Sequence, residues 1–259
     1  MSPTTYHKLQ DKHVLVIGGS SGIGLAVAEA ALASGAKVTI SSSSPAKVIA
    51  AVSNLSTSYP DRTVRGLTTD LSKPSAEADL ATLFDAAQNG LGSINHVVFT
   101  AADPLSLGGL DSVTADGIHA AAHMRMVVPV LVAKVAARYL PAVNTSSLTI
   151  TSGSVSERPT KGWSVISYFA GGLVSLARAL ALDLAPMRVN VVRPGYVDTG
   201  LWGHMSAEEK ADMVKGVEAK MPTGKFGAVE DVAEAYLWLM KDGNATGAVA
   251  GTDSGALLV

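Results

Sequence analysis

The chain has 259 residues, of which 47% are hydrophobic and 16% charged, and its formal net charge is −2. This composition excludes a disordered chain, and without a block of basic residues nucleic-acid binding has no electrostatic support. The chain contains no cysteine, which excludes disulfides and thiolate metal ligands, and its six histidines show no spacing typical of a metal site. The polar start and the lack of any uninterrupted apolar run long enough to span a bilayer predict a soluble, cytoplasmic protein without a membrane segment.

The first predicted unit is a strand, a glycine-rich turn and a helix. Four apolar residues at 14–17 form the strand, and an alanine-rich helix covers 22–34. The backbone N–H groups at such a helix start can hold a phosphate. Gly18 permits the tight turn, Gly22 lets the backbone approach a pyrophosphate, and Gly24 lets the helix pack against the strand. The turn indicates a dinucleotide site, although glycines also serve ordinary turns.

The rest of the chain repeats the order of strand and helix. Further strands are predicted at 37–41, 63–66, 94–99, 147–151, 188–192 and 248–250. Further helices are predicted after Ser44-Pro45 and at 75–87, 114–140, 163–184 and 230–240, with an irregular segment between 100 and about 110. This order predicts an α/β fold, a Rossmann-type doubly wound parallel sheet flanked by helices, in a single domain over 1–259.

A short polar helix is predicted between the last two units. Ser206-Ala207-Glu208-Glu209 has the pattern of a capping box, and Gly200 and Gly203 before it can act as hinges. The segment 200–224 is therefore either a surface excursion or a small lid over a substrate.

Five segments in the right order make the chain resemble the short-chain dehydrogenase/reductase (SDR) superfamily over nearly its whole length. They are the glycine motif at 18–24, Asp70-Leu71 after the third strand, Phe99-Thr100-Ala101-Ala102 at the family's Asn-Asn-Ala-Gly position, Pro194-Gly195-Tyr196-Val197-Asp198-Thr199, and the C-terminal 246–255. The resemblance implies a nicotinamide cofactor held by Gly18, Ser20, Ser21, Gly22, Ile23, Gly24, Ser41, Ser42, Ser43, Asp70, Leu71, Thr100, Ala101, Ala102, Pro194, Gly195, Val197 and Thr199.

The end of the second strand favours NADP(H) over NAD(H). An acidic residue there would bind both ribose hydroxyls and repel a 2′-phosphate. The aligned position is Ser42, within the run Ser41-Ser42-Ser43-Ser44, and Lys47 follows one helical turn later. Four hydroxyls remove the repulsion and offer donors to a phosphate, although a serine-rich run can also simply start a helix.

The family's catalytic residues are replaced. The resemblance places the family's Tyr at Ile166, its Lys at Ala170, its Ser at Gly153 and its Asn at Arg125. In the family the Tyr is the general acid, the Lys lowers the pKa of the Tyr and holds the ribose, the Ser orients the carbonyl and the Asn sustains a proton relay. Ile and Ala donate no proton, so reduction of a neutral ketone is disabled by this route. Hydride delivery to an iminium needs no proton at the acceptor carbon, which makes a carbon–nitrogen double bond the predicted acceptor.

Four nearby residues are candidate catalytic replacements. Arg125 can hold a carboxylate, an amide oxygen or a phosphate, or it is a charge paired at a helix interface. Trp163 can stack on a flat or cationic substrate, or it packs in the core. Ser152 can supply a hydroxyl, and because successive strand residues face opposite sides we expect at most one of Ser152 and Ser154 to reach the site. Asp103 is a proton donor, a counter-ion or a turn-forming residue.

Arg125 and Trp163 together resemble an atypical branch of the superfamily found in alkaloid natural-product pathways. Members of that branch use NADPH to reduce a cyclic iminium and steer a following cyclisation, with an acidic residue where this chain has Thr160. The leading interpretation is an NADP(H)-dependent oxidoreductase of secondary metabolism that acts on an imine-like small molecule. A redox-neutral cyclase or isomerase and a non-catalytic NADP(H)-binding protein remain alternatives.

The resemblance also implies assembly, because family members form dimers or tetramers through their two long helices. Small and apolar residues fill both 117–139 and 163–184, as such an interface needs. We expect a homodimer or homotetramer, with a small molecule as the substrate. Tyr168 is expected to be packed or at an interface, and His123 to be packed or paired.

Overall fold

A single parallel sheet organises the fold. The computed structural model describes residues 5–103, 109–203 and 205–259. Within these residues seven parallel strands follow the order β3-β2-β1-β4-β5-β6-β7. The strands are β1 (His13–Ile17), β2 (Lys37–Ser42), β3 (Val64–Thr68), β4 (Ile94–Phe99), β5 (Ser147–Thr151), β6 (Arg188–Pro194) and β7 (Val249–Thr252). The strand order reverses between β1 and β4, which is where α/β sheets bind ligands. The predicted Rossmann-type sheet is confirmed.

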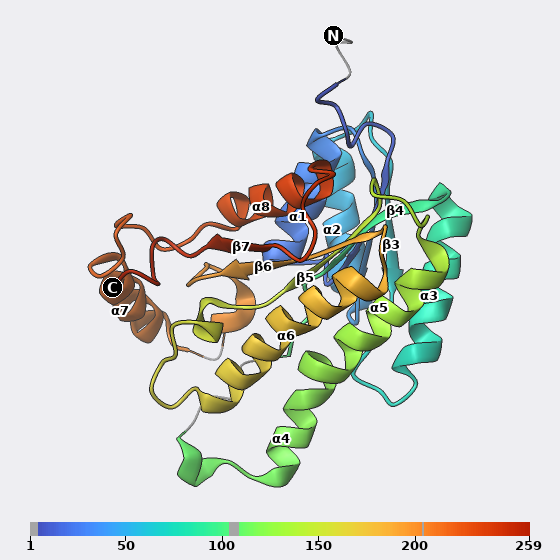
Figure 1. The fold of residues 1–259 in the computed structure, drawn as a ribbon. Helices are drawn as coiled ribbons and strands as arrows, with labels where there is room; N and C mark the ends of the chain where they lie inside the picture. Colours follow the sequence, from blue (N-terminus) through green and yellow to red (C-terminus); the bar gives the residue numbers. More distant parts are fainter. Residues whose placement is uncertain (1–4, 104–108, 204) are drawn as a thin grey trace.

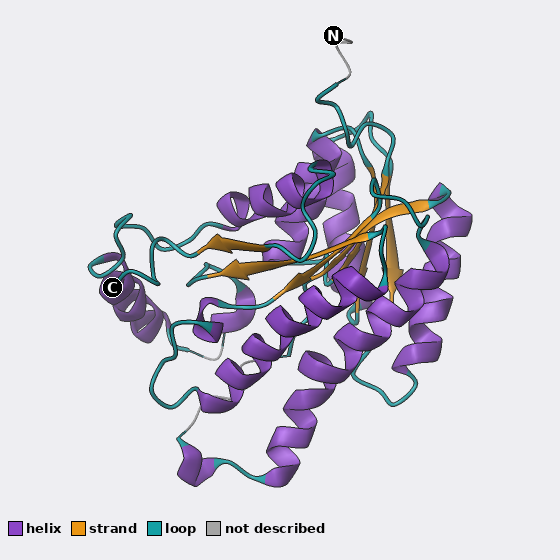
Figure 2. Ribbon diagram, viewed as in Figure 1, coloured by secondary structure: helices purple, strands orange, loops and turns teal. Residues whose placement is uncertain are grey.

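Helices cover both faces of the sheet (Figure 2). One face packs against α1 (Gly22–Ala33), α2 (Pro45–Ser58) and α8 (Val229–Lys241). The other packs against α3 (Ala76–Leu91), α5 (Val128–Tyr139) and α6 (Ser164–Asp183). Two further helices, α4 (Ala115–Ala122) and α7 (Ala207–Glu218), lie beyond the carboxyl ends of the strands (Figure 1). The short polar helix predicted after β6 is thus α7, which lies at the carboxyl edge of the sheet.

The apolar run of β1 at 14–17 follows from this double cover. In β1, Leu15 and Ile17 pack with the α3, α5 and α6 side, while Val14 and Val16 pack with the α1 and α8 side. All five residues of β1 are buried. A strand buried on both faces reads as a continuous apolar run because its alternating side chains both meet helices.

The long helix predicted at 114–140 contains a break in its regular hydrogen bonding. Between α4 and α5 the chain forms a π-helical turn at His123–Val127. The cause is Pro129, which lacks the N–H that would donate to the carbonyl of Arg125, four residues earlier, and whose ring crowds that carbonyl. The ladder therefore widens at Arg125, and π turns of this kind often occur at functional sites.

Smaller differences concern element ends. Helix α3 runs four residues past the predicted end, because nothing breaks it before Gly92 at φ +86°. Strand β3 pairs with β2 as far as Thr68, two residues beyond the prediction. Tyr168 is exposed on α6, so the prediction that it packs within this chain is wrong. The alternative, that it lies at an interface, stays a prediction. Of the irregular segment at 100–110, residues 104–108 lie outside the described residues.

Two helical segments meet the length and hydropathy of a membrane span. They are Ala115–Tyr139 and Ser164–Asp183, with mean hydropathy 1.5 and 1.7. Neither is an uninterrupted apolar run, since the first contains Arg125 and Lys134 and the second Arg178. The α5 part of the first segment and the α6 helix of the second pack on the sheet, which explains their apolar faces. Location in the cytoplasm stays a prediction.

A buried histidine makes the fold sensitive to acid. His96 on β4 is 2% exposed, and its Nδ1 lies 2.8 Å from the Ser147 hydroxyl. Burial lowers the pKa of His96 from 6.5 to about 3, with smaller contributions from the charges of Arg188 and Lys12. The ring is therefore neutral in the folded protein across the acid range in which the unfolded chain protonates it.

We predict that His96→Gln flattens the acid dependence of stability. The contribution of His96 is fully present above the unfolded pKa of 6.5 and is lost as the pH falls towards about 3. Its loss lowers the free energy of unfolding by roughly 1.4 kcal/mol per pH unit in that window. Urea unfolding across this range measures the slope, with His119→Gln on the exposed face of α4 as the matched control. An unchanged slope in His96→Gln would contradict the assignment.

Candidate functional site

The glycine turn after β1 is packed against the ends of β2 and β4. The N–H groups of Gly18 and Gly19 donate to the Ser41 carbonyl at 2.8 and 3.1 Å. From β4, the N–H of Thr100 donates to the Ile17 carbonyl at 2.9 Å, and its hydroxyl donates to the Ile17 and Gly18 carbonyls. These bonds fix the path of the turn between three strand ends.

At Gly18 and Gly24 the turn leaves no room for a side chain, as a phosphate cradle requires. A Cβ on Gly18, which has φ +93°, would lie 2.5 Å from the Ala101 nitrogen, and one on Gly24 would lie 2.3 Å from the Gly18 oxygen. Helix α1 begins directly after the turn, and the Ser21 side chain makes no capping hydrogen bond there. The backbone donors of the first helical turn are thus available to an anion, so this cradle fits a pyrophosphate.

A cavity of about 840 Å³ runs along the carboxyl edge of the sheet from β2 and β3 to β6. Every residue predicted to contact the cofactor lines it, from the glycine turn through Ser41–Ser43, Asp70-Leu71 and Thr100–Ala102 to Thr199. The four catalytic candidates Asp103, Arg125, Ser152 and Trp163 line it too. Residues far apart in sequence are therefore brought to one cavity, as the motif order predicts. Within the described residues no group of three or more His, Cys, Asp or Glu side chains could hold a metal ion.

At the β2 end, the serine run provides fewer outward hydroxyls than the sequence suggests. The Ser41 hydroxyl is buried, without a hydrogen-bond partner among the described residues, and Ser44 caps α2 by accepting from the Lys47 N–H. Ser42 is half-buried, while Ser43 and Lys47 are exposed. At this end of the cavity the donors are thus two hydroxyls and one ammonium group, and β2 ends without a carboxylate. This set fits a 2′-phosphate.

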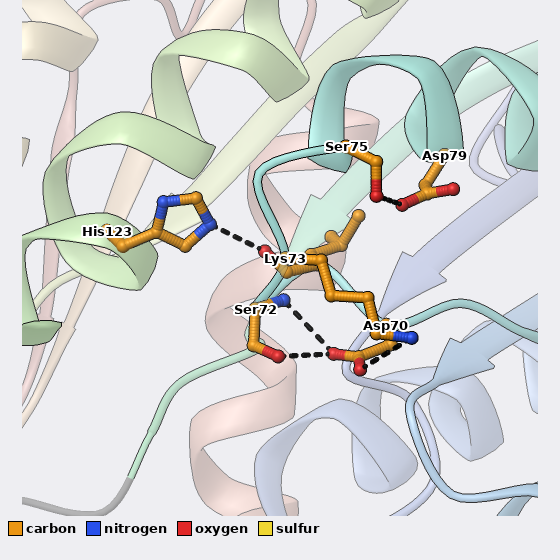
Figure 3. A network of polar contacts seen from close by, with 7 residues as sticks. Asp70, Ser72, Lys73, Ser75, Asp79 and His123 are labelled. Atoms are coloured by element: carbon orange, nitrogen blue, oxygen red, sulfur yellow. Dashed lines mark hydrogen bonds and ion pairs between the residues drawn. The ribbon is translucent and has the colours of Figure 1, made fainter.

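Asp70, after β3, is held by its own turn (Figure 3). Its carboxylate accepts from the Ser72 hydroxyl at 2.7 Å and from the Ser72 N–H at 3.1 Å. These hydrogen bonds, helped by Lys73 at 3.4 Å, hold the pKa of Asp70 below its usual range. The carboxylate is therefore ionised at neutral pH and fixed at the β3 end of the cavity, where the resemblance predicts the adenine.

The π-helical turn places Arg125 in the cavity and is tied down on both sides. His123 lies 2.9 Å from the Leu71 carbonyl (Figure 3), and the Arg125 Nη2 donates to the Asp103 carbonyl at 2.6 Å. Burial lowers the pKa of Arg125, and the charge of Asp103 partly offsets this effect. An arginine stays protonated under such a shift, so the site holds a cation beside the end of β4. His123 is paired, as expected.

The positions of the family's catalytic side chains face the same cavity but offer no proton donor. Gly153, Ile166 and Ala170 all line it, and Phe169, Leu173 and Met124 add to this apolar wall. The Ser152 hydroxyl donates to the Ala170 carbonyl at 2.8 Å, which ties the end of β5 to the middle of α6. A Cβ on Gly153 would meet only Val155, at 3.7 Å, so space for a serine exists there.

Whether at most one of the Ser152 and Ser154 hydroxyls serves the site stays a prediction, although both residues line the cavity. Both line it because β5 ends at Thr151 and the chain continues into a 3-10 turn at Ser154–Ser156. Strand alternation no longer applies beyond Thr151.

Two aromatic residues of the cavity, Tyr196 and Trp202, were not among the predicted site residues. Both line the cavity, and Trp202 is nearly buried at 6% exposure. The signal for Trp202 in the sequence is its position between two glycines, Gly200 and Gly203, directly after the predicted cofactor segment. Periodicity says nothing about such a residue because it lies in a 3-10 turn at Gly200–Trp202 rather than on a regular helix face.

We predict that Gly24→Ala disrupts dinucleotide binding, because its Cβ overlaps the Gly18 carbonyl and the Thr100 hydroxyl. Overpacking of this kind costs about 1–3 kcal/mol, so we expect NADPH affinity to fall by roughly tenfold or more. Calorimetric titration of NADPH measures the affinity. Gly216→Ala on α7, where an added Cβ meets nothing within 4 Å, is the control and should bind like the parent. Equal affinity in both variants would contradict the cradle.

Comparisons with known proteins agree with this fold. The model of the SDR-like Rossmann domain family matches residues 6–259. The chain is 41% identical to the short-chain dehydrogenase/reductase fsr5 of Gibberella fujikuroi, over 97% of this chain and 96% of the relative. It is 40% identical to the short-chain dehydrogenase/reductase malC of Malbranchea aurantiaca over the whole of both chains.

Solved structures give the same result. The structure described as the MalC reductase/Diels-Alderase from Malbranchea aurantiaca superposes with a TM-score of 0.92 over 98% of this chain and all of that chain. A small-chain dehydrogenase in complex with NADPH superposes with a TM-score of 0.77 at 26% identity, over 96% of this chain and all of that one.

Proposed function

Because the chain belongs to the short-chain dehydrogenase/reductase family, we propose that it is an NADP(H)-dependent oxidoreductase that reduces the carbon–nitrogen double bond of an iminium-type small molecule. The observation that carries the proposal is the apolar wall formed where the family has its Tyr and Lys. Ile166 and Ala170 line the cavity beside the predicted nicotinamide segment and donate no proton. A substrate for this site must therefore accept a hydride without needing an acid.

The choice of NADP(H) rests on the end of β2. Ser42, Ser43 and Lys47 line the cavity where an acidic residue would repel a 2′-phosphate. Asp70 lies further along, after β3, where it is held by Ser72. A solved family member at 26% identity is described in complex with NADPH, which supports this choice.

When bound, NADPH supplies a hydride, and an iminium carbon that accepts one needs no proton because the electron pair of the C=N bond becomes the nitrogen lone pair. The protein's part is to bind the substrate, to orient it and to exclude water. Met124, Phe169 and Leu173 form an apolar wall that keeps water away from a reactive iminium. Ala170 leaves α6 without the family's lysine, so the cation of this site is Arg125, which is held on the Asp103 carbonyl beside the end of β4.

Arg125 and Trp163 are the residues we assign to substrate orientation. Arg125 has its guanidinium anchored on the Asp103 carbonyl, and such a fixed fork can take an amide or carboxylate oxygen of the substrate. Trp163 lies immediately before α6, as its N-cap, and its ring lines the cavity. Stacking on Trp163 fixes the plane of the substrate, and Arg125 fixes its direction within that plane.

A second candidate function is a redox-neutral cyclisation in the same chamber. The relative malC is described in its solved structure as a reductase/Diels-Alderase, and this chain shares 40% of its residues with it. An apolar cavity that orients a flat substrate is suited to folding a reactive intermediate. The two functions differ in whether NADPH is consumed, and a protein that only binds NADP(H) would do neither.

The matched pair of an N-methylated dihydroisoquinolinium ion and the bicyclic ketone tetralone tests the proposal. We expect the protein to oxidise NADPH with the iminium and not with the ketone, at a rate that shows no titration of a general acid. NADPH absorbance measures both reactions. The double variant Ile166→Tyr/Ala170→Lys restores the family's acid pair and is expected to gain ketone reduction, with its fold checked by thermal melting. Ketone reduction by the parent, or no reaction across a broad iminium panel, contradicts the proposal.

We predict that Ser42→Asp reverses the cofactor preference. The new carboxylate repels a 2′-phosphate and binds the ribose hydroxyls of NADH, so NADPH affinity should fall by roughly tenfold or more while NADH affinity holds or rises. Calorimetric titration with both nucleotides measures the ratio. Ser53→Asp, on the exposed face of α2, adds the same charge away from the cavity and should leave the ratio unchanged. A parent protein that prefers NADH would contradict the assignment.

We further propose that the protein works in secondary metabolism and assembles as a homodimer or homotetramer. The exposed apolar residues Val127, Val130 and Tyr168 on the two long helices support such an interface. Sedimentation of the purified protein measures the assembly.

A further inference from the structure

Three aromatic rings from separate parts of the chain meet at one end of the cavity. Trp163 precedes α6, Tyr196 follows β6, and Trp202 lies in the 3-10 turn that begins the lid segment 200–224. The Trp163 and Trp202 centroids are 6.5 Å apart, and Tyr196 stacks on Trp202 at 5.9 Å with 23° between the planes. All three residues line the cavity, and we call them the aromatic wall.

Trp202 couples this wall to the lid. Its Nε1 donates to the Val197 carbonyl at 2.8 Å, which fixes the ring beside the cofactor segment. It also belongs to a small apolar cluster with Val217 of α7 and Phe226, against which Met205, Met213 and Met221 pack. Methionine side chains adapt to different shapes, so the lid can repack around a bound group while Trp202 stays anchored.

Two carboxylates line the cavity within the described residues, Asp70 and Asp103. Among the described residues that line the cavity, Lys47 and Asp70 belong to the β2 and β3 end, away from the wall. Asp103 and Arg125 lie together at the β4 end, where their charges offset each other. Positive charge on a substrate beside Trp163 therefore meets aromatic rings in place of an acidic side chain.

We propose that the aromatic wall is the substrate subsite for a planar, π-rich cation, and that Trp202 is its specificity-determining residue. The inference rests on the proposed function and names the substrate class for it. Aromatic rings attract a flat ring system by stacking and a delocalised cation by its charge. Cation–π attraction reaches about 2 kcal/mol in a desolvated site, equivalent to roughly a 30-fold change in affinity. A planar iminium conjugated with an aromatic ring satisfies both requirements.

Binding of unreactive probes to the NADPH-loaded protein tests the subsite without turnover. The probes are protonated aminobenzimidazole, which is a planar cation, benzimidazole, which is planar and neutral near neutral pH, and tetraethylammonium, which is a cation without a plane. Calorimetric titration measures each dissociation constant. We expect the planar cation to bind at least roughly tenfold more tightly than either of the other two probes.

Variants at Trp202 separate the subsite from a purely structural role. Trp202→Leu keeps an apolar side chain and should weaken the planar cation by about tenfold, while Trp202→Phe keeps a ring and should retain most of the affinity. Tyr196→Leu provides a second removal of a wall ring, should Trp202→Leu fail to melt cooperatively. Trp238→Phe on α8, 47% exposed and bonded to Asp242, is the matched control and should bind like the parent.

The outcomes distinguish the subsite from the proposed reaction. Tight, Trp202-dependent binding of the planar cation supports the subsite even where no iminium is reduced, a result that would overturn the reaction alone. Equal binding of the neutral probe overturns the charge preference. Unchanged affinity in both Trp202→Leu and Tyr196→Leu overturns the subsite, whatever the protein does with NADPH.

Discussion

The contact between the glycine turn and the end of β4 is the constraint on which the rest of the site depends. Gly18 and Gly24 are packed so closely against Ala101 and Thr100 that a single added carbon at either position would overlap backbone or hydroxyl atoms. This contact holds the start of α1 at the point where the strand order reverses. A phosphate cradle, the cavity that continues from it and the segment leading to Asp103 all take their position from that packing.

A second constraint explains why the other end of the cavity differs from a conventional reductase site. Pro129 interrupts the long helix and produces the π-helical turn, which His123 and Arg125 tie to the ends of β3 and β4. The turn thus delivers a fixed guanidinium where the family has an asparagine. Across the cavity, α6 presents Ile166 and Ala170, so the protein combines a glycine-turn cradle with a cavity wall that lacks the family's Tyr and Lys. This combination is the basis on which we propose a substrate that brings its own positive charge.

Much of this arrangement could be predicted from the sequence, because motif order in a parallel sheet determines which segments share its carboxyl edge. The glycine turn, Asp70, Thr100 and Pro194 could all be placed this way, and all line the cavity. Other features depend on tertiary contacts that no local pattern reports. The burial of the Ser41 hydroxyl and the hydrogen bond from the Ser152 hydroxyl to the Ala170 carbonyl follow from packing against neighbouring elements. The π turn had a visible cause in Pro129, but Trp202 joins the site only through the fold of the segment that follows β6.

The measurement that tests the central claim most directly is the fate of the hydride. The protein is incubated with an iminium substrate and NADPH that carries deuterium at both hydrogen positions of the nicotinamide carbon that donates the hydride. The product is analysed by mass spectrometry and NMR. The account predicts one deuterium at the former iminium carbon, in a single stereochemical sense, with one equivalent of NADPH oxidised. Turnover of the substrate to a product that carries no deuterium would contradict it and would assign the chamber to redox-neutral chemistry.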